Sequence, residues 1–286
     1  MDRLLVIGTG LIGGSFALAM RGAAAFVRIE GYDTDPGAAH RARELGLIDA
    51  VVTDLSAGVA AADAVFIAAP TGDIAPLVRR IAAAGGQSVT IFDAGSVKGS
   101  VLEALRRDGD VPSRFVPCHP MAGSERQGPD AADGNLFRGR RVLVTPPLGT
   151  DRAAVDRVRG WWKAAGAEVI ETDPRIHDEM VALTSHLPHL IAYTYMAWVG
   201  EPHSGAAREF AGPGLADFTR IAAADASMWR EIIAENQPAV VAQFDGWIAL
   251  LTTAGEMVRE GRFDELEQLF ARARAAHTKL TGQKRE

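Results

Sequence analysis

Two short segments combine small residues with side chains that donate or accept protons, and each follows a predicted strand. Residues 93–98 (DAGSVK) follow the apolar run 89–92, and residues 118–125 (CHPMAGSE) follow 114–116. In an open parallel sheet, the loops at the carboxyl ends of the strands face the ligand crevice. We therefore expect the two segments to converge. The imidazole of His119 titrates near neutral pH, which suits proton transfer at that point.

A glycine-rich turn near the N-terminus has the spacing G-x-G-x-x-G and directly follows a short apolar run. In such a motif Gly8 permits the tight turn, Gly10 lets a pyrophosphate approach the backbone, and Gly13 lets helix and strand pack closely. The motif, which includes Leu11 and Ile12, opens a helical pattern over residues 15–20, and the N-terminal N–H groups of that helix face the phosphates. The motif predicts dinucleotide binding, with an ordinary glycine turn as the alternative.

An acidic residue at the end of the second predicted strand indicates which dinucleotide is bound. Asp33 lies 20 residues beyond Gly13, where a carboxylate can hold the ribose 2′-hydroxyl and repel a 2′-phosphate. NAD is therefore favoured over NADP. Asp33 also begins a stretch rich in turn residues, which offers a purely structural role. The nearby Arg41 and Arg43 leave NADP as an alternative cofactor.

Strands alternate with helices through the first part of the chain. One strand, residues 64–69, ends at Pro70 and Thr71, where small residues let a cofactor ribose lie close. The alternation predicts an α/β fold, a Rossmann-type doubly wound parallel sheet, over residues 1–172. Residues 173–286 show only long helical patterns, so an all-α C-terminal domain is expected to follow. Its apolar composition predicts a homodimer through this helical domain.

Composition excludes several classes of protein. The chain has 286 residues, 48% hydrophobic and 23% charged, and a net charge of −6, which argues against a nucleic-acid-binding surface. Its single cysteine excludes an intramolecular disulfide and fits a reducing compartment. No leader peptide or bilayer-spanning apolar run of about 20 residues is recognised. A cytoplasmic protein that binds a small molecule, with no nucleic-acid or membrane partner, is expected.

Two places in the helical half carry polar groups within apolar surroundings. His186 and His189 stand three residues apart in SHLPH, on one face if the segment is helical, and Arg220 stands in FTRIA. His186 has the alternative role of a hydrogen-bonded core histidine, and Arg220 that of a surface ion pair. No His-Glu-x-x-His motif or thiolate cluster is present, so no metal is predicted.

Taken together, these segments resemble the prephenate dehydrogenase family, which includes arogenate and cyclohexadienyl dehydrogenases. The resemblance covers nearly the whole chain, and its most specific parts are HPMAGSE and SHLPH. The matching segments are residues 8–13, 93–98, 119–125, 185–189, 217–221 and 228–229.

The resemblance implies NAD-dependent oxidative decarboxylation of prephenate to 4-hydroxyphenylpyruvate in tyrosine biosynthesis, or of arogenate to tyrosine. A base removes the proton of the 4-hydroxyl, C4 gives its hydride to the nicotinamide, and the ring carboxylate leaves as CO2. By position, His119 matches the histidine that bonds the 4-hydroxyl, and Ser96 the serine that orients it. The other residues carried over bind the substrate or set the charge near it, and they are His189, Arg220, Glu125, Lys98 and His186.

Three rival functions are weighed against this one. A nucleophilic pair of Cys118 and His119 is disfavoured because adjacent residues of an extended segment point to opposite faces. A 3-hydroxyacid dehydrogenase shares the two-part architecture but depends on a lysine in its helical half, where this chain has only Lys279 and Lys284. A sensor of the NAD redox state has no use for Ser96, His119 and Arg220.

Overall fold

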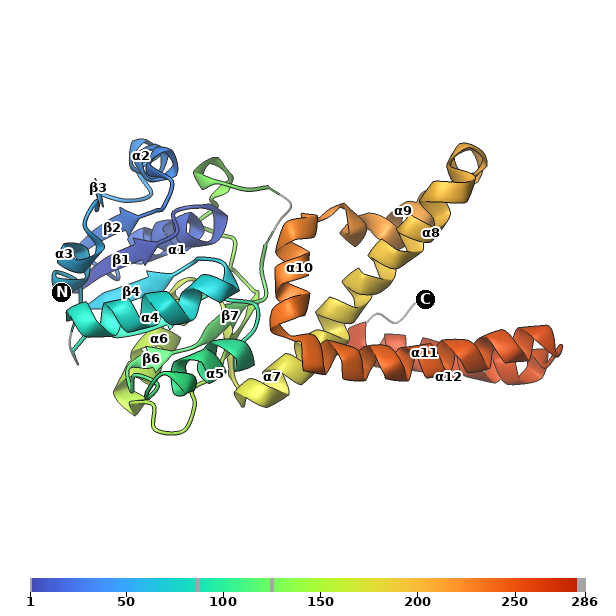
Figure 1. Ribbon diagram of the computed structural model, residues 1–286. Coiled ribbons are helices and arrows are strands. Elements are labelled where there is room, and N and C mark those ends of the chain that lie inside the picture. The colour runs from blue at the N-terminus through green and yellow to red at the C-terminus, as the bar shows by residue number, and fades with distance from the viewer. Residues whose placement is uncertain (1, 86–87, 124–125, 282–286) are drawn as a thin grey trace. The chain divides into compact units, whose positions relative to one another are not determined.

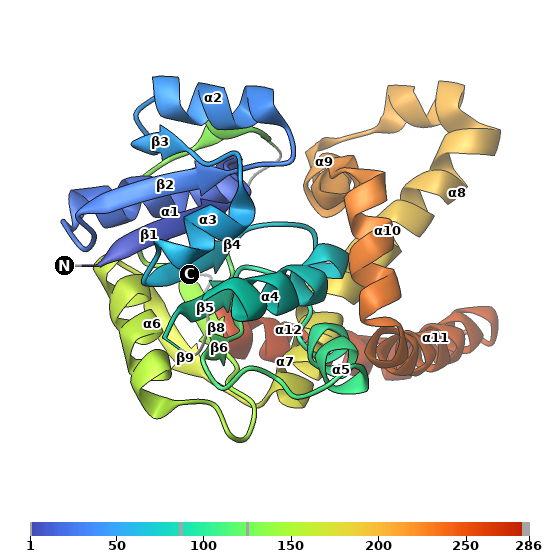
Figure 2. The same ribbon diagram turned by 60° about the vertical axis from the view of Figure 1, so that its left-hand side comes forward.

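The computed structural model describes residues 2–85, 88–123 and 126–281, and it divides into two compact units, residues 1–237 and 238–286. Figures 1 and 2 together label these elements. The strands are β1 (Arg3–Ile7), β2 (Arg28–Tyr32), β3 (Ala50–Val51), β4 (Ala64–Ile67), β5 (Thr90–Asp93), β6 (Phe115–Val116), β7 (Cys118–Pro120), β8 (Arg141–Val144) and β9 (Glu168–Glu171). The α-helices of the first unit are α1 (Leu11–Gly22), α2 (Pro36–Glu44), α3 (Leu55–Ala60), α4 (Thr71–Gly85), α5 (Gly99–Arg107), α6 (Arg152–Ala164), α7 (Pro174–Val181), α8 (Leu187–Phe210), α9 (Pro213–Thr219) and α10 (Ala226–Glu235).

The main sheet has the strand order β3-β2-β1-β4-β5-β6, and the pairs in it are parallel. This is the order of a dinucleotide-binding doubly wound sheet, in which the ligand lies where the strand order reverses, here between β1 and β4. The predicted fold class, a Rossmann-type sheet followed by helices, is confirmed.

Helices cover both faces of the sheet, and alternating side chains of each strand fill two separate cores (Figures 1 and 2). Leu4 and Val6 of β1 face α1, α2 and α6, while Leu5 and Ile7 face α3, α4 and α5. The first core is built around stacked and edge-on rings: Phe16, Phe66, Phe92, Phe137, Trp161 and Trp162. Burial on both faces makes the central strands β1 and β4 almost continuously apolar, as expected for a parallel sheet.

A second, three-stranded sheet carries His119. Strands β7 and β8 pair antiparallel, and β8 and β9 pair parallel, with His119 opposite Leu143. The sequence predicts a single parallel sheet with His119 in the loop after residues 114–116. Pro117 explains the difference, because it has no N–H to continue the β5–β6 ladder and the chain changes sheets there.

Aspartate carboxylates cap several helices of the first unit. An aspartate directly precedes each of five helices, and its carboxylate accepts hydrogen bonds from N–H groups in the first turn of that helix. These helices are α2, α3, α6, α7 and α10. Helix α5 differs, because it begins at Gly99 after Lys98, and Ser96 does not cap it. A serine at position 96 could cap a helix that begins at Val97, but α5 begins two residues later and this expectation is wrong. Asp178 supplies the cap instead, accepting hydrogen bonds from the backbone nitrogens of Lys98 (3.0 Å) and Gly99 (2.6 Å).

Between α7 and α8 lies one π-helical turn, η2 (Ala182–His186), and between α9 and α10 lies the 3-10 turn η3 (Arg220–Ala223). Another 3-10 turn, η1 (Pro129–Ala131), follows β7. A π turn widens the helix by one residue and is frequent at functional sites. Helices α7 and α10 contact α5 and α4 respectively, so this part of the helical half packs on the nucleotide-binding part (Figure 2).

Residues 238–286 form the second unit, which is described by itself. It holds most of α11 (Gln237–Arg259) and all of α12 (Phe263–Thr281). Many of their apolar side chains are exposed: Val241, Ile248, Leu250, Leu251, Val258, Phe263, Phe270 and Leu280. Among the residues that the structure describes, no helix is both long and apolar enough to cross a membrane.

Candidate active site

The glycine-rich turn has the geometry that its spacing predicts. Gly8 adopts φ +86°, and a Cβ there would overlap the carbonyl oxygen of Ala68. A Cβ at Gly13 would overlap the carbonyl oxygen of Gly8, so only glycine lets α1 pack this close to β1. At Gly10 the nearest atom to an added Cβ lies 3.9 Å away, so the backbone is open to a ligand. Leu11 and Ile12 form the first turn of α1, whose N–H groups suit a pyrophosphate.

Asp33 follows β2 directly and is partly buried. Its Oδ2 accepts hydrogen bonds from the backbone nitrogen (2.7 Å) and hydroxyl (2.9 Å) of Thr9, and its Oδ1 accepts one from Asp35 N (3.0 Å). The carboxylate thus ties the glycine-rich turn to the end of β2. Because each carboxylate oxygen has two lone pairs, it can still accept a ribose hydroxyl.

Arg41, which kept NADP open, pairs with carboxylates. Its guanidinium lies 2.6 Å from Asp130 and 3.2 Å from Glu44, which raises its pKa, mainly through the hydrogen bond to Asp130. Asp130 belongs to η1, which packs on α2. Pro70 precedes α4, and the buried Thr71 is the first residue of that helix.

Lys98 is buried at the start of α5 and connects three segments. Its Nζ donates to Asp93 Oδ2 (2.6 Å) and to the carbonyl oxygen of Cys118 (2.7 Å). Asp93 in turn accepts hydrogen bonds from Cys118 N (2.9 Å) and Gly95 N (2.9 Å). Lysine and aspartate are both within 1% of complete burial. This network fixes the strand residue that precedes His119.

His119 is buried and forms a hydrogen-bonded series with two residues of α7. Its Nδ1 lies 2.9 Å from Nε2 of His177, and Nδ1 of His177 lies 2.7 Å from Oδ1 of Asp178. The two imidazole rings meet edge-on, 5.1 Å apart. This Asp–His–His series joins the nucleotide-binding part to the first helix that follows it.

Electrostatics favour the neutral form of both rings and the charged form of the carboxyl. Burial is the main cause that lowers the pKa of His119 well below its usual value, helped by His177 and Lys98. Burial likewise lowers the pKa of His177, although Asp178 opposes it. For Asp178, burial disfavours the charge, but hydrogen bonds from His177, Lys98 and Gly99 outweigh it and lower the pKa.

His186 and His189 occupy different environments on consecutive turns. His186 is fully buried, its Nδ1 accepts a hydrogen bond from the Asn236 amide (3.2 Å), and burial lowers its pKa to about 4. His189 is half-buried and stacks on Trp229, with ring centroids 3.5 Å apart. Its Nδ1 donates to the carbonyl oxygen of Ser185 (2.9 Å). Burial lowers the pKa of His189, and the nearby charge of Arg220 adds to this effect.

The two loops and the helical residues meet through a small apolar cluster. Val97, next to the partly exposed Ser96, packs with Trp229 and Ile232 of α10. Trp229 is also the ring on which His189 stacks. The structure thus brings the Ser96 loop, His119, His189 and the exposed Arg220 into one neighbourhood of the first unit. Glu125 lies outside the described residues.

Other chemistry is poorly supported at this site. Burial raises the pKa of the Cys118 thiol, and its Sγ lies 3.4 Å from the carbonyl oxygen of Val116, so a thiolate is disfavoured. Within residues 2–85, 88–123 and 126–281, no group of three or more His, Cys, Asp or Glu side chains could hold a metal ion.

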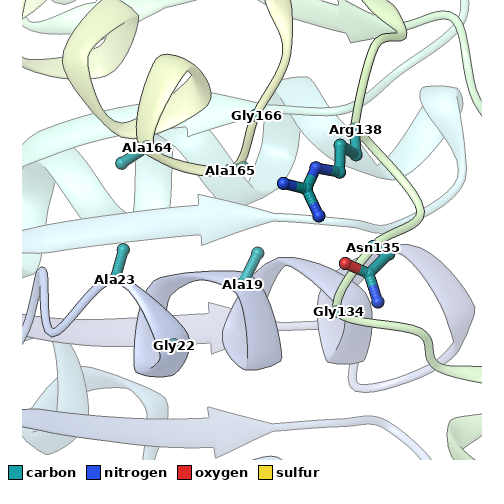
Figure 3. Close-up of a pocket in the computed structure, with 9 residues that line it drawn as sticks. All are labelled: Ala19, Gly22, Ala23, Gly134, Asn135, Arg138, Ala164, Ala165 and Gly166. Carbon is teal, nitrogen blue, oxygen red and sulfur yellow. The ribbon is translucent and has the colours of Figure 1, made fainter.

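A cavity of about 230 Å³ lies elsewhere, lined by none of the sequence-predicted site residues. It is bordered by the end of α1, residues 134–138 and the end of α6, and the Arg138 side chain extends toward it (Figure 3). Helix C-termini carry partial negative charge, which the guanidinium of Arg138 complements. We therefore assign the Arg138 guanidinium a structural role at these helix ends.

Comparison with known proteins agrees with this geometry. Residues 16–171 match the prephenate dehydrogenase nucleotide-binding domain, and residues 173–272 match the prephenate dehydrogenase dimerization domain. A cyclohexadienyl dehydrogenase of Zymomonas mobilis is 34% identical over 282 residues, which is 97% of this chain and 95% of the relative. The chain belongs to the prephenate dehydrogenase family.

Further relatives support the same assignment. A prephenate dehydrogenase of Bacillus subtilis is 34% identical over 96% of this chain and 74% of the relative. The crystal structure of Aquifex aeolicus prephenate dehydrogenase in complex with hydroxyphenyl propionate and NAD+ has a TM-score of 0.91 at 29% identity, with 98% of each chain covered. This prephenate dehydrogenase family member is a dehydrogenase with a nucleotide-binding domain.

Sequence reasoning missed several residues of the candidate site. His177, Asp178 and Asn236 were not singled out, and Trp229 was noted only as part of a family segment. The available signal was the adjacent pair His177 and Asp178, which lies in the short helix α7, and only the fold places that pair beside His119.

Proposed function

We propose that this enzyme carries out the NAD-dependent oxidative decarboxylation of prephenate to 4-hydroxyphenylpyruvate, a step of tyrosine biosynthesis. When bound, the nicotinamide accepts the hydride from C4 of the cyclohexadienol. The protein supplies a base for the 4-hydroxyl proton, cations for the substrate's two carboxylates, and a site that excludes water.

The observation that carries this proposal is the state of His119. The ring is buried and its pKa is lowered, mainly by burial, so it is neutral near pH 7. Its Nδ1 is already hydrogen-bonded to His177, and among the described residues none is hydrogen-bonded to its Nε2, which we assign to the substrate. A neutral imidazole with an unprotonated nitrogen is suited to accept the proton of the 4-hydroxyl. Ser96, on the partly exposed loop after β5, is assigned to orient that hydroxyl.

Arg220 is the residue we assign to a substrate carboxylate, because a guanidinium can bind it with two parallel hydrogen bonds. His189 is assigned to the same end of the substrate. Since its Nδ1 donates to Ser185, a neutral His189 offers a lone pair at Nε2, and binding a carboxylate there requires that the ring takes up a proton. His186 is held by Asn236 and Lys98 by Asp93, so we assign both to support of the site.

NAD fits the residues of the glycine-rich turn. The open backbone at Gly10 and the start of α1 suit the pyrophosphate, and the Asp33 carboxylate suits a ribose 2′-hydroxyl and repels a 2′-phosphate. Arg41, paired with Asp130 and Glu44, offers less to a 2′-phosphate than a free guanidinium does. Pro70 and Thr71, at the start of α4, are assigned to the cofactor ribose.

The test is formation of NADH or NADPH with prephenate, arogenate and 3-hydroxyacids supplied separately, each with NAD and with NADP. The proposal expects NADH from prephenate in the presence of NAD, with 4-hydroxyphenylpyruvate as the product. Turnover of a 3-hydroxyacid alone would contradict it.

Arogenate is the second candidate substrate. It differs from prephenate in having an amino group in place of the side-chain keto group, and the 24%-identical Synechocystis arogenate dehydrogenase has the same fold at a TM-score of 0.84. A higher kcat/KM for arogenate than for prephenate would select this function, with tyrosine as the direct product.

We propose further that residues 173–286 act as the helical substrate-binding and dimerisation domain, and residues 1–172 as the nucleotide-binding domain. The match to a dimerization domain and the exposed apolar side chains of α11 and α12 support a homodimer. Light scattering at micromolar concentration is expected to give the mass of two chains. A mass of one chain would contradict it. A cytoplasmic location stays a prediction based on the single cysteine.

A further inference from the structure

The hydrogen-bonded series Asp178–His177–His119 has a consequence for the protons on both rings. Asp178 is ionised, because its hydrogen bonds outweigh the effect of burial and lower its pKa. A carboxylate only accepts hydrogen bonds. Nδ1 of His177, 2.7 Å from Oδ1 of Asp178, therefore carries a proton and donates it.

The state of His177 then determines that of His119. His177 is fully buried and its pKa is lowered, mainly by burial, so the ring carries a single proton near pH 7. With that proton on Nδ1, its Nε2 is an acceptor. The atom 2.9 Å away, Nδ1 of His119, must be the donor. His119, itself neutral, is left with an unprotonated Nε2.

We propose that His177 and Asp178 are positioning residues that hold His119 in the Nδ1–H tautomer, so that its Nε2 is always the proton acceptor. The Nε2–H form is the commoner tautomer of a free histidine side chain and could not act as a base through Nε2. The inference rests on the role proposed for His119. It adds the residues that make this role possible.

The hydrogen bond to His177 is kept in the product of proton transfer. When Nε2 of His119 takes a proton, its Nδ1–H stays hydrogen-bonded to His177, and the negative charge of Asp178 lies beyond that ring. Lys98 opposes the new positive charge, as do His177 and His186 when protonated. The charged and titratable groups around the series are Asp93, Lys98, His177, Asp178 and His186.

Further hydrogen bonds hold the Asp178 side chain in one position. Its carboxylate also accepts hydrogen bonds from the backbone nitrogens of Lys98 and Gly99, and its backbone carbonyl accepts one from the Asn236 amide (2.9 Å). An added Cβ at Gly99 would lie 2.6 Å from Oδ2. The glycine therefore leaves room for the carboxylate beside the start of α5, and the cap of α5 and the orientation of His177 depend on one side chain.

The direct test is 15N NMR of the histidine rings in the ligand-free wild-type protein, since protonated and unprotonated ring nitrogens give well-separated signals. The proposal expects His119 with a protonated Nδ1 and an unprotonated Nε2 at pH 7. A protonated Nε2 on neutral His119 would overturn it. This readout needs neither substrate nor cofactor, so it stands apart from the proposed function: absence of turnover with every cyclohexadienol would reject only the latter.

Variants separate orientation from simple support of the fold. Asp178→Ala removes the acceptor, and we expect the Nε2–H tautomer of His119 to appear and kcat to fall by roughly 10²–10⁴-fold, with the KM for prephenate within about threefold. In Asp178→Asn the amide oxygen can accept from His177 only if the NH2 group faces the N–H of Gly99, another donor. We therefore expect the Nδ1–H tautomer to persist in part and kcat to fall less than in Asp178→Ala.

The matched control is Asp173→Ala, which removes the cap of the same helix α7 by deleting the acceptor for Arg175 N and Ile176 N. It is expected to lower the Tm while the His119 signals and kcat stay unchanged. If Asp178→Ala likewise lowers only the Tm, with the His119 tautomer unaltered, Asp178 is merely a cap and the proposal fails. If Asp178→Ala does not fold, the tautomer of His119 in the wild-type protein still tests the proposal.

Discussion

Nζ of Lys98 lies 2.6 Å from Oδ2 of Asp93, and both side chains are almost completely buried. The same amino group donates to the carbonyl oxygen of Cys118, one residue before His119. The ion pair therefore fixes the position of the proposed base through the backbone. Family resemblance had assigned Lys98 to the substrate, and its contacts in this structure are with the protein.

Replacing Lys98 by Met is expected to lower the free energy of unfolding by about 3–5 kcal/mol, because it leaves the Asp93 carboxylate buried without its partner. Urea denaturation measures the change. Arg107→Met, which breaks the exposed pair with Glu103, is the control and is expected to change stability by less than about 1 kcal/mol. Similar losses in both variants would show that the buried pair contributes no more than a surface pair.

His119→Asn is expected to reduce kcat by roughly 10²–10⁴-fold, the usual contribution of a general base. Binding of NAD, measured by calorimetry, is expected to stay the same, because His119 is placed at the substrate. His40→Asn, at an exposed position of α2, serves as the control. Unchanged turnover in His119→Asn would remove this residue from the mechanism.

Arg220→Ala is expected to raise the KM for prephenate about 10-fold or more and to change kcat less, since a charge-assisted hydrogen bond to a carboxylate contributes about 1.5–3 kcal/mol. Steady-state kinetics separate the two constants. Arg230→Ala removes an exposed arginine of α10 that lies 3.5 Å from Glu231, and it should behave as the wild type. A change confined to NAD affinity would show that Arg220 is assigned to the wrong ligand.

Asp33→Asn tests the preference for NAD. The amide oxygen can still accept from Thr9, so the glycine-rich turn stays tied to β2, while the charge that repels a 2′-phosphate is lost. The ratio of kcat/KM for NAD to that for NADP is expected to fall about 10-fold, equivalent to about 1.4 kcal/mol. An unaltered ratio would leave Asp33 with only its structural role.

Stability is expected to fall in mild acid because buried histidines stay neutral in the folded protein. The pKa of His186 is about 4 when folded, against about 6.5 in the unfolded chain. Neutral His186 therefore contributes about 3 kcal/mol to the free energy of unfolding above pH 6.5, and this contribution is lost as the pH falls toward 4. His119 and His177, whose pKa values are also lowered, act in the same direction.

Urea denaturation at pH 7 and pH 5 measures this loss. In His186→Gln, whose amide oxygen can still accept from Asn236, the difference between the two pH values is expected to shrink by about 2 kcal/mol. His40→Gln, at an exposed position, should leave the difference unchanged. A wild-type protein equally stable at both pH values would contradict the prediction.

The α/β class and the glycine-rich turn were predictable because they depend on local patterns. Continuous apolar strands, helices between them and glycines at fixed spacing each specify their own conformation within a few residues. Ser96 was not predictable in this way: it has the chemistry of a cap, but Asp178, distant in the sequence, already binds the N–H groups of α5. A tertiary contact therefore decides which side chain caps α5, and the local preference of serine for cap positions does not.

By itself, the sequence determined the order of strands and helices, the nucleotide-binding turn and the family segments that name His119, His189 and Arg220. Only the tertiary structure decided that His119 lies in a second sheet, beside His177 and Asp178 of a helix nearly 60 residues further along the chain. Which nitrogen carries a proton depends on partners a few ångströms away, and the spacing of residues in a sequence does not contain those distances.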